Sequence, residues 1–368
     1  MVKKPRSGPD FILFIIVLLL ITVGIVMVYS SSYVYAQVTY ADGAHYLKNQ
    51  LVWALLGIVG MIVVMNINYK IYQKWAYPFF GLAVILLLLL LVPGVGITIK
   101  DATRWIGVGD FASFQPSEIA KLALVIFLAK YLSKRQDHVK QFFRGLAIPL
   151  LVVGGVCLLI LKQPDLGTAA TIAGTAFLML LAAGANIGQL GFLGLIGGGL
   201  AAAAIFMEPY RMRRIMAFRD PWSDPLGKGF QTIQALLAVG SGRVFGAGLG
   251  QGRQKFLYLP EQHTDFIFAV LAEELGFIGT TFVLLLFLVF MWRGLKIAIK
   301  APDSFGALLA AGITIMVVLQ ALVNIGVVTG CLPVTGITLP FISYGGSSLT
   351  LNLLGIGILL NISRYVEE

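Results

Sequence analysis

The sequence predicts an all-α integral membrane protein, a polytopic bundle of about ten transmembrane helices with a large extracellular loop between helices 7 and 8. Of its 368 residues, 58% are hydrophobic and only 12% are charged. The mean hydropathy is +0.89. A soluble domain has too few polar side chains to cover so much apolar surface, whereas helices of ~20 apolar residues place it in lipid. A soluble enzyme, a secreted disulfide scaffold and a disordered chain are therefore excluded.

Apolar runs of spanning length divide the chain. The first, which begins at Phe11, follows Lys3, Lys4 and Arg6 as in a signal peptide, but it is long enough to span and lacks a small-residue cleavage site. We therefore interpret it as a retained helix. No hydrophilic stretch is long enough for a separate domain, so residues 1–368 are expected to form a single membrane domain. The runs cover residues 11–29, 50–67, 76–93, 116–133, 146–161, 166–184, 188–207, 265–292, 305–330 and 342–362.

Basic residues in the connections predict the orientation, because cationic loops resist translocation. One set of connections holds Lys3, Lys4, Arg6, Lys70, Lys74, Lys134, Arg135, Lys140, Arg144, Arg293, Lys296, Lys300 and Arg364, and the short connections on the other side hold only Lys48, Lys100, Arg104 and Lys162. We therefore expect a multi-pass protein of the cytoplasmic membrane with both termini cytoplasmic. The net charge of +10 is then explained by a cationic cytoplasmic face that lies against anionic lipid. We expect no nucleic acid as a partner.

The large outer loop, about residues 208–264, is itself net cationic. Long loops are exempt from the positive-inside rule, so this does not overturn the orientation. A cationic surface beside the outer leaflet suits an anionic lipid-linked ligand such as a diphosphate, because Arg offers forked donors to phosphate oxygens. Ordinary contact with lipid headgroups is the alternative. Within this loop, Phe230 to Val239 predicts an amphipathic interfacial helix.

Several kinds of site are excluded by residue spacing. Gln251 stands where a dinucleotide fingerprint needs its third Gly, and no Walker loop is present. His45, His138 and His263 are scattered over loops on both sides, so they predict no metal site and no base for a serine nucleophile. No cofactor is evident. Ionisable groups within or beside the helices are therefore the candidates for function.

Three of these ionisable residues lie near predicted helix starts. Glu118 and Lys121 are three residues apart and share a helix face, where they can pair with each other or with a neighbouring helix. A purely structural ion pair is the alternative. Asp165 stands where a carboxylate would cap a helix, and we favour capping over catalysis.

Asp265 is the strongest catalytic candidate. It closes the cationic loop and opens the eighth helix, which places one carboxylate at the membrane surface beside basic side chains. Such a base can accept a proton from a sugar hydroxyl, and an N-cap is the alternative. Glu273 and Glu274 follow two turns later, and because they are adjacent they point in different directions, one of them toward the bundle interior.

Together these segments resemble the SEDS family (shape, elongation, division and sporulation), the RodA, FtsW and SpoVE proteins, from about residue 10 to Tyr365. Asp220-Pro221-Trp222 and Arg253-Gln254-Lys255-Phe256 place the resemblance closest to the division and sporulation branch of spore-forming Gram-positive bacteria. The shared motifs are Arg104-Trp105-Ile106, Gln115-Pro116-Ser117-Glu118 with Lys121, Gln163 to Thr168, Phe245 to Gly250, Pro260 to Gly276, and Leu339 to Ser347.

The resemblance implies a peptidoglycan glycosyltransferase that polymerises lipid II outside the cytoplasmic membrane, with a single-pass class B penicillin-binding protein as its transpeptidase partner. The family's essential aspartate corresponds to Asp265. Its ion-pair helix corresponds to Glu118 and Lys121, and its Arg and Trp of the second outer loop correspond to Arg104 and Trp105. The candidates for a structural or functional polar core are Glu118, Lys121, Asp165, Glu273 and Glu274. Some relatives carry Lys where this chain has Thr335, so a cationic role there is in doubt. The substrate-binding candidates are Arg104, Trp105, Arg211, Arg213, Arg214, Arg243, Lys255, Ser343 and Tyr344.

The hypothesis that follows makes Asp265 the general base of an inverting glycosyl transfer. The arginines of the outer loop would stabilise the diphosphate leaving group, and a divalent cation is a further source of stabilisation for which no ligand set is recognisable. A lipid II flippase is one alternative, and it predicts a polar cavity at mid-membrane with inverted halves. A non-catalytic scaffold for the penicillin-binding protein is another, and it would tolerate the loss of Asp265.

Overall fold

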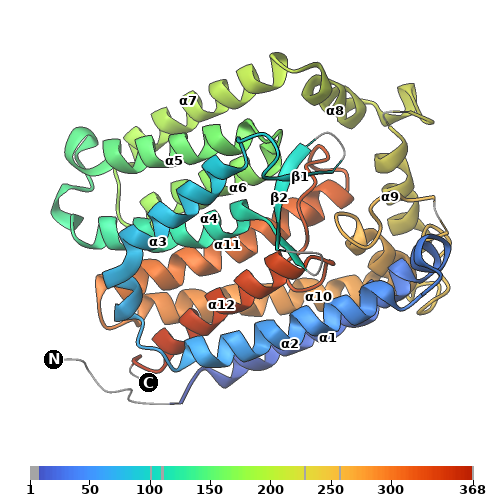
Figure 1. Cartoon of the computed structure of the whole chain (residues 1–368), viewed down its shortest axis with the longest axis horizontal. Coiled ribbons are helices and arrows are strands. Elements are labelled where there is room, and N and C mark those ends of the chain that lie inside the picture. The colour runs from blue at the N-terminus through green and yellow to red at the C-terminus, as the bar shows by residue number, and fades with distance from the viewer. Residues whose placement is uncertain (1–7, 100–101, 109–111, 228, 257, 367–368) are drawn as a thin grey trace.

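The computed structural model describes residues 8–99, 102–108, 112–227, 229–256 and 258–366. Within these residues, long helices run side by side to form one elongated bundle (Figure 1). They correspond to the ten predicted runs. Their bounds are α1 Phe11–Tyr40, α2 His45–Met65, α3 Lys70–Leu89, α4 Pro116–Ser133, α5 Ala147–Leu161, α6 Leu166–Ala182, α7 Ile187–Phe206, α10 Ile267–Ile299, α11 Ser304–Val328 and α12 Gly346–Ser363.

Among the described residues, 8 helices are long and apolar enough to cross a membrane by themselves. The other two predicted spans are α4, which carries Glu118, Lys121 and Lys130, and α6, which is apolar but has only 17 residues. Almost every residue of α4 is buried. A helix enclosed by protein can carry charges that lipid would exclude, so the polarity of α4 is consistent with its central place.

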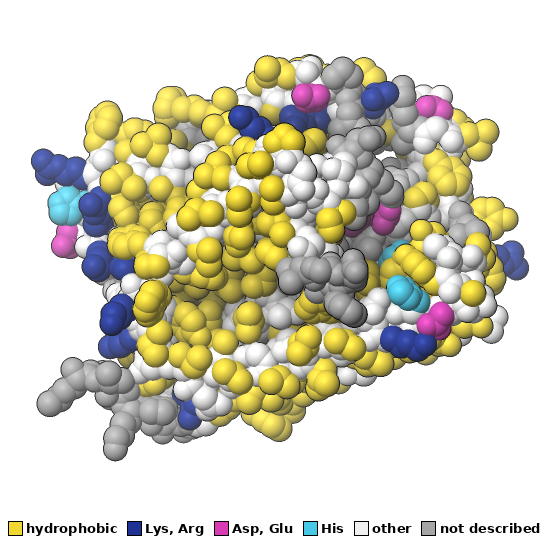
Figure 2. Space-filling model, in the orientation of Figure 1, with side chains coloured by type: hydrophobic (Ala, Val, Ile, Leu, Met, Phe, Trp, Pro, Cys, Tyr) yellow, Lys and Arg dark blue, Asp and Glu magenta, His cyan; other side chains and the backbone are white. Residues whose placement is uncertain are grey.

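The core of the bundle lies around α4, α11 and α12. Helix α12 packs along α2, α10 packs against α11 and α1, and α4 lies between α3 and α11. Helix α7, by contrast, is almost entirely exposed and lies at the edge of the bundle (Figure 1). Hydrophobic side chains cover a broad band of the surface, as expected for a lipid-facing belt (Figure 2).

Both ends of the described chain lie at the same end of the bundle. The backbone N–H of Asp10 donates to Ser363 Oγ over 3.0 Å, which joins the start of α1 to the end of α12. Arg293 of α10 binds the Asp10 carboxylate through Nε at 2.9 Å. Lys and Arg side chains gather at this end, on the left in Figure 2. The starts of α2, α4, α6, α10 and α12 therefore lie at the opposite end.

The large loop is built from two helices and a segment that locks onto α10. Helix α8 covers Pro209–Arg219, and α9 covers Phe230–Ser241, which confirms the predicted helix in this loop. Helix α10 is broken at Gly276, whose φ is 65°. The freed N–H groups of Phe277 and Ile278 donate to the carbonyls of Arg243 and Val244, at 2.9 and 3.2 Å. The loop thus replaces the helical hydrogen bonds that the break removes.

The all-α prediction is incomplete in one connection. Strands β1 (Ile97–Ile99), β2 (Ala102–Val108) and β3 (Ala112–Phe114) form an antiparallel sheet between α3 and α4. β-Branched residues such as Ile97, Thr98 and Thr103 favour this extended pairing. The remaining short elements are two 3₁₀ turns, Gln136–His138 and Pro221–Ser223, and a π-helical turn, Phe142–Leu146.

Candidate active site

Helix α4 contributes a buried ion pair. Pro116 occupies its first turn, where the missing N–H costs no helical hydrogen bond. Lys121 Nζ lies 2.8 Å from Glu118 Oε1, and the two side chains are 7% and 8% exposed. The same ammonium donates to Gln320 Oε1 of α11 over 2.7 Å. Lys121 therefore pairs both with its own helix and with a neighbour, the two arrangements that the spacing predicts.

Strand β2 brings Arg104 to the start of α6. Arg104 Nε donates to Gln163 O over 2.9 Å, and Nη2 donates to Pro164 O over 2.6 Å. Its Nη1 lies 3.7 Å from Asp165 Oδ2. The Asp165 carboxylate accepts the N–H and the hydroxyl of Thr168, each over 3.0 Å. Asp165 is thus the N-cap of α6, as the sequence predicts, and Arg104 ties the small sheet to it.

Asp265 lies in the turn just before α10, with its backbone held from two sides. Its carbonyl accepts from Asn324 Nδ2 of α11 over 2.7 Å. The carbonyl of Thr264 accepts from Ser343 Oγ over 2.6 Å. The N-cap of α10 is Phe266, so the alternative interpretation of Asp265 as an N-cap is wrong and the helix begins two residues later than predicted.

Gly336 lies against the Asp265 carboxylate. Its φ of 80° is in the left-handed region that glycine tolerates best. A Cβ at Gly336 would lie 3.5 Å from Asp265 Oδ2. Asn324 Nδ2 also donates to Ile337 O over 2.7 Å, so one amide positions both Asp265 and this loop. Thr335, which stands where some relatives have Lys, packs against Gly167 of α6.

These elements enclose a polar cavity of about 460 Å³ at the end of the bundle opposite to Asp10 and Ser363. Among the described residues, four carboxylates and two cations line it, so this described part of the wall is acidic on balance. Among the predicted site residues, the cavity brings together Arg104, Trp105, Glu118, Lys121, Asp165, Asp265 and Tyr344. Residues far apart in the sequence thus meet in one place because five helix starts converge there.

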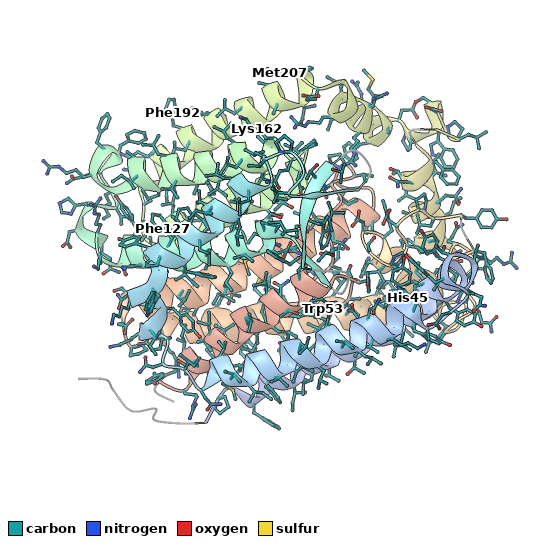
Figure 3. The ribbon with its side chains drawn as sticks, in the orientation of Figure 1. His45, Trp53, Phe127, Lys162, Phe192 and Met207 are labelled. Atoms are coloured by element: carbon teal, nitrogen blue, oxygen red, sulfur yellow. The ribbon has the colours of Figure 1, made fainter. Side chains whose placement is uncertain are left out.

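Several lining residues were missed by the sequence analysis. Asn49 and Trp53 reach the cavity from α2, the helix on which Figure 3 labels Trp53. Glu261 joins them from the turn before Asp265, and Gln320 from α11. Gln320 could have been predicted from the sequence, because a side-chain amide within an apolar transmembrane run is costly unless it has a partner or a function. Asn49 and Glu261 stand near a helix start and in a loop, where polar residues are common, and Trp53 is an aromatic residue within an apolar run, so none of the three was distinctive in the sequence.

Tyr344 lies partly buried at the cavity wall, and burial raises the pKa of its phenol above the ordinary value. The phenol is therefore neutral at physiological pH and can donate a hydrogen bond. Its neighbour Ser343 is buried and donates to Thr264 O while accepting from Leu339 N over 2.8 Å. Ser343 was predicted to bind substrate, but its hydroxyl is occupied in holding the Asp265 turn.

The arginines of α8 do not line the cavity that the described residues form. Arg211 donates to the carbonyls of Ala204 and Leu161, over 2.8 and 3.3 Å, near the ends of α7 and α5. Arg214 donates to Val334 O over 2.9 Å. Arg213 is exposed. Arg211, Arg213 and Arg214 were predicted to stabilise a diphosphate leaving group, and this role stays a prediction for residues that lie outside the cavity.

Arg243 and Lys255 are likewise outside the cavity. Arg243 is exposed beside the break in α10. Lys255 is buried, and its Nζ lies 2.9 Å from Glu274 Oε1. Glu274 also accepts from Ser30 Oγ of α1, whereas Glu273 accepts from the backbone N–H groups of residues 253 and 254. The two glutamates point in different directions, as predicted, and together they fasten the large loop to the bundle.

No group of three or more His, Cys, Asp or Glu side chains is arranged to hold a metal ion among the described residues.

Comparisons with known proteins agree with this arrangement. The family model FtsW/RodA/SpoVE, described as "Cell cycle protein", matches residues 10–368. Stage V sporulation protein E of Bacillus subtilis (strain 168) is 51% identical over 98% of both chains. The probable peptidoglycan glycosyltransferase FtsW of Geobacter sp. (strain M18) is 48% identical, also over 98% of both chains.

Solved structures show the same fold. A chain of a peptidoglycan synthase complex, described as coordinating polymerization and crosslinking, is 33% identical with a TM-score of 0.77, over 97% of this chain and 98% of that one. The rod shape determining protein RodA of Thermus thermophilus is 30% identical with a TM-score of 0.72, over 98% of both chains.

Proposed function

The chain belongs to the FtsW/RodA/SpoVE family, and from this premise we propose that it is a peptidoglycan glycosyltransferase that polymerises lipid II into glycan strands. The family is established by the match over nearly the whole chain and by relatives about half identical to it. Several of these relatives are named as probable peptidoglycan glycosyltransferases.

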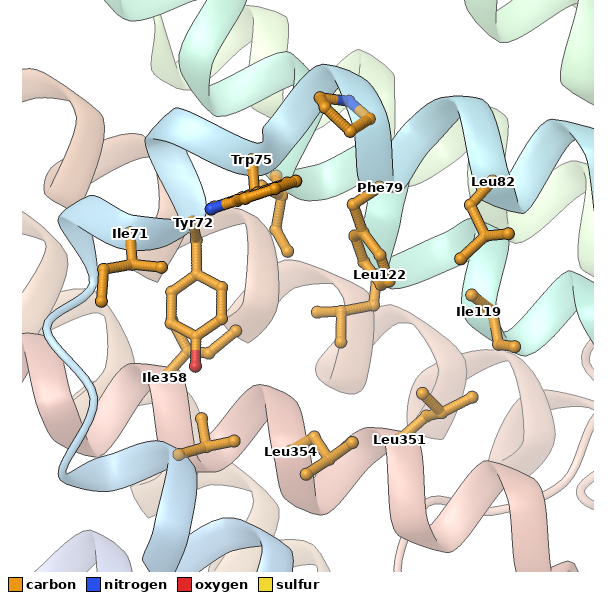
Figure 4. A pocket seen from close by; sticks show the side chains of 13 residues that line it. Ile71, Tyr72, Trp75, Phe79, Leu82, Ile119, Leu122, Leu351, Leu354 and Ile358 are labelled. Carbon is orange, nitrogen blue, oxygen red and sulfur yellow. The ribbon is translucent and has the colours of Figure 1, made fainter.

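One observation carries the proposal: an apolar groove leads up to the polar cavity. The groove has a volume of about 570 Å³ and lies between α2, α3, α4 and α12 (Figure 4). Ile119 and Leu122 line the groove, and each is adjacent in sequence to a cavity residue, Glu118 or Lys121. Leu351 follows the cavity residue Ser348 by less than one helical turn. A polar head and a long apolar tail on one substrate fit this pair of sites.

The groove is suited to a polyprenyl chain. Its walls are aromatic and branched side chains, and Figure 4 shows Tyr72, Trp75 and Phe79 of α3 along one side, with Leu354 of α12 opposite. Trp75 is 58% exposed, so this face opens toward lipid. A tail in the groove would keep the sugar at the cavity. The two substrates would then be held close together and in a fixed orientation, which lowers the entropic cost of the reaction.

The proposed orientation places the cavity outside the cell. Lys and Arg side chains gather at the end where α1 begins and α12 ends (Figure 2). Cationic connections stay on the cytoplasmic side, so the termini are cytoplasmic. The cavity lies at the other end and therefore faces the outer leaflet.

In the proposed reaction, Asp265 acts as general base. Its carboxylate takes the proton of the 4-hydroxyl of the GlcNAc of one lipid II as that oxygen attacks the anomeric carbon of the strand's lipid-linked MurNAc. The bond from that carbon to the diphosphate breaks, the diphosphate leaves with the electron pair, and the configuration inverts. Arg104 and Lys121 are the cations that line the cavity. They replace the loop arginines as the residues proposed to offset the charge of the leaving group.

A class B penicillin-binding protein is the proposed partner. One structural neighbour is a chain of a peptidoglycan synthase complex in which polymerization and crosslinking are coordinated. The outer loop of this chain exposes apolar side chains, among them Trp222, Leu226 and Phe245. Exposed apolar residues in a loop above the membrane are typical of a protein contact.

The test is polymerisation by purified protein in detergent with fluorescent lipid II, with and without a class B penicillin-binding protein. The wild type should produce glycan strands, and because detergent has no sidedness, strands cannot result from flipping. Asp265→Ala should produce none, whereas Asp137→Ala, an exposed carboxylate outside the cavity, should match the wild type. Normal synthesis by folded Asp265→Ala would remove the proposed base. No strands from the wild type under either condition would remove the polymerase proposal.

A further inference from the structure

A chain of aromatic rings leads from the cavity wall to the top of the α1–α2 hairpin. Tyr344, which lines the cavity, packs against Tyr46 with ring centroids 4.8 Å apart. Tyr46 lies 5.9 Å from Tyr40, and Tyr40 stacks on His45 at 4.1 Å with an interplanar angle of 13°. We call the rings of Tyr35, Tyr40, His45, Tyr46, His263 and Tyr344 the aromatic ridge.

The ridge is continuous and firmly held. His263 packs against Tyr46 at 4.4 Å and against Tyr35 at 5.7 Å, so the turn that carries Asp265 touches the ridge directly. The hairpin beneath it closes within residues 41–44, and the N–H of Gly43 donates to Gln37 Oε1 over 3.0 Å. Rings fixed in this way lose little conformational freedom when a ligand binds.

The upper part of the ridge stands above the lipid. Helix α1 has 30 residues. At ~1.5 Å per residue it is about 45 Å long, whereas the hydrocarbon core is ~30 Å thick. Asp10, bound to Arg293, marks the inner end of α1. The hydrocarbon is then crossed by about residue 30, and Tyr35 and Tyr40 lie beyond it, roughly 7 to 15 Å further out.

Tyr40 is therefore not explained as part of a membrane-interface belt. Belt aromatics sit at headgroup level with their rings in contact with lipid. Tyr40 is 49% exposed although His45 stacks on one of its faces. Tyr35 is 37% exposed. Asn49, which lines the cavity, lies beside the ridge, with its Nδ2 3.3 Å from His45 Nε2.

We infer that the aromatic ridge is a binding surface for the glycan strand, in which pyranose rings stack on Tyr35 and Tyr40 beside the cavity. The C–H face of a pyranose is apolar and lies flat on an aromatic ring, while phenol, imidazole and amide groups can bond the sugar hydroxyls. The inference rests on the proposed function, since it requires that the cavity handles a sugar. A surface that starts at the cavity wall would hold the strand while the next lipid-linked substrate enters.

The first test measures binding and needs no catalysis. A fluorescent, lipid-free strand of alternating N-acetylhexosamines is titrated into the full-length protein in detergent. Tyr35→Ala/Tyr40→Ala should weaken binding, by about fivefold for each stacked ring lost. Tyr29→Ala is the matched control, because Tyr29 lies on the same helix and is 42% exposed but stands at the level of the lipid. It should bind the strand as the wild type does.

The second test uses the wild-type protein, so that it does not depend on the folding of a variant. A strand carrying a photoreactive group is cross-linked to the protein, and the labelled peptide is identified. Label within residues 33–46, or on the ridge residues His263 and Tyr344, supports the inference. Label elsewhere, equal binding by Tyr35→Ala/Tyr40→Ala and wild type, or equal loss in Tyr29→Ala would overturn it. Because the strand is made beforehand, these outcomes are separate from a failure of lipid II polymerisation.

Discussion

Replacing Lys255 with methionine removes the only cation within ion-pair distance of Glu274 among the described residues. The Glu274 side chain is 0% exposed, and Lys255 Nζ lies 2.9 Å from its Oε1. Of its partners, the Ser30 hydroxyl, 2.6 Å from Oε2, would remain. An uncompensated buried charge costs about 3–5 kcal/mol, so we expect Lys255→Met to lower the free energy of unfolding by that amount.

The double variant Lys255→Met/Glu274→Gln should recover most of the loss. It removes both charges, and the new amide can still bond Ser30 Oγ, so we expect a cost of about 1 kcal/mol relative to the wild type. The assay is chemical unfolding of the purified protein in detergent, read as the four corners of a double-mutant cycle. The difference between single and double variants measures the coupling of the two charges.

A control separates burial from charge. Lys48→Met breaks the Lys48–Asp42 pair, whose side chains are 67% and 39% exposed. Water screens such a pair, and stability should not change measurably. If Lys255→Met is as stable as Lys48→Met, or if the double variant is no more stable than Lys255→Met, the Glu274 carboxylate is not held as an ion in the bundle, and the reasoning fails.

Three further predictions concern the site. Gly336→Ala should strain a backbone with a φ of 80° and crowd the Asp265 carboxylate, so it should reduce the rate of lipid II conversion while lowering stability by about 1 kcal/mol; an unchanged rate would contradict this. Asn324→Ala leaves one buried and one partly buried carbonyl without their donor, so it should lower both the reaction rate and, by about 2 kcal/mol, the stability. Asn361→Ala at the far end of the bundle should lower stability alone, and equal effects of the two variants on the rate would count against the positioning role of Asn324. Burial raises the pKa of Tyr344 above that of an unfolded chain, so its contribution to stability is complete below about pH 10 and is lost as the pH rises further. Tyr344→Phe should therefore make the free energy of unfolding fall less steeply between about pH 8 and 11, and an unchanged slope would refute this prediction.

Helix positions could be predicted because each apolar run has the length of a membrane span. The structure extends α1 to Tyr40, 11 residues beyond the predicted end at Tyr29. The helix continues because the polar residues after Tyr29 face protein and water. Hydropathy averaged along the sequence shows where the apolar residues end, but it does not show where the helix ends. The sheet at β1–β3 was missed for a related reason, since three short strands pair only with each other and leave no run of spanning length.

The candidate site was predicted in part, and the errors are of one kind. The cavity brings together five predicted residues, Arg104, Glu118, Lys121, Asp165 and Asp265. They could be predicted because charged side chains within or beside membrane helices are costly unless they have a function. The cations of the outer loop carry the same charge in the sequence but lie elsewhere. Charge is a property of the residue, whereas its neighbours depend on how the chain folds back.

The sequence by itself determined that the chain spans a membrane, which segments cross it, and which few ionisable residues stand among them, because the transfer of apolar and charged groups into lipid depends on composition and length. Only the tertiary structure decided which of these residues share a cavity. It also decided that an apolar groove adjoins this cavity, that Lys255 pairs with Glu274 and that the aromatic ridge reaches the Asp265 turn. Those relations join residues tens to hundreds of positions apart, and they exist only once the helices have packed.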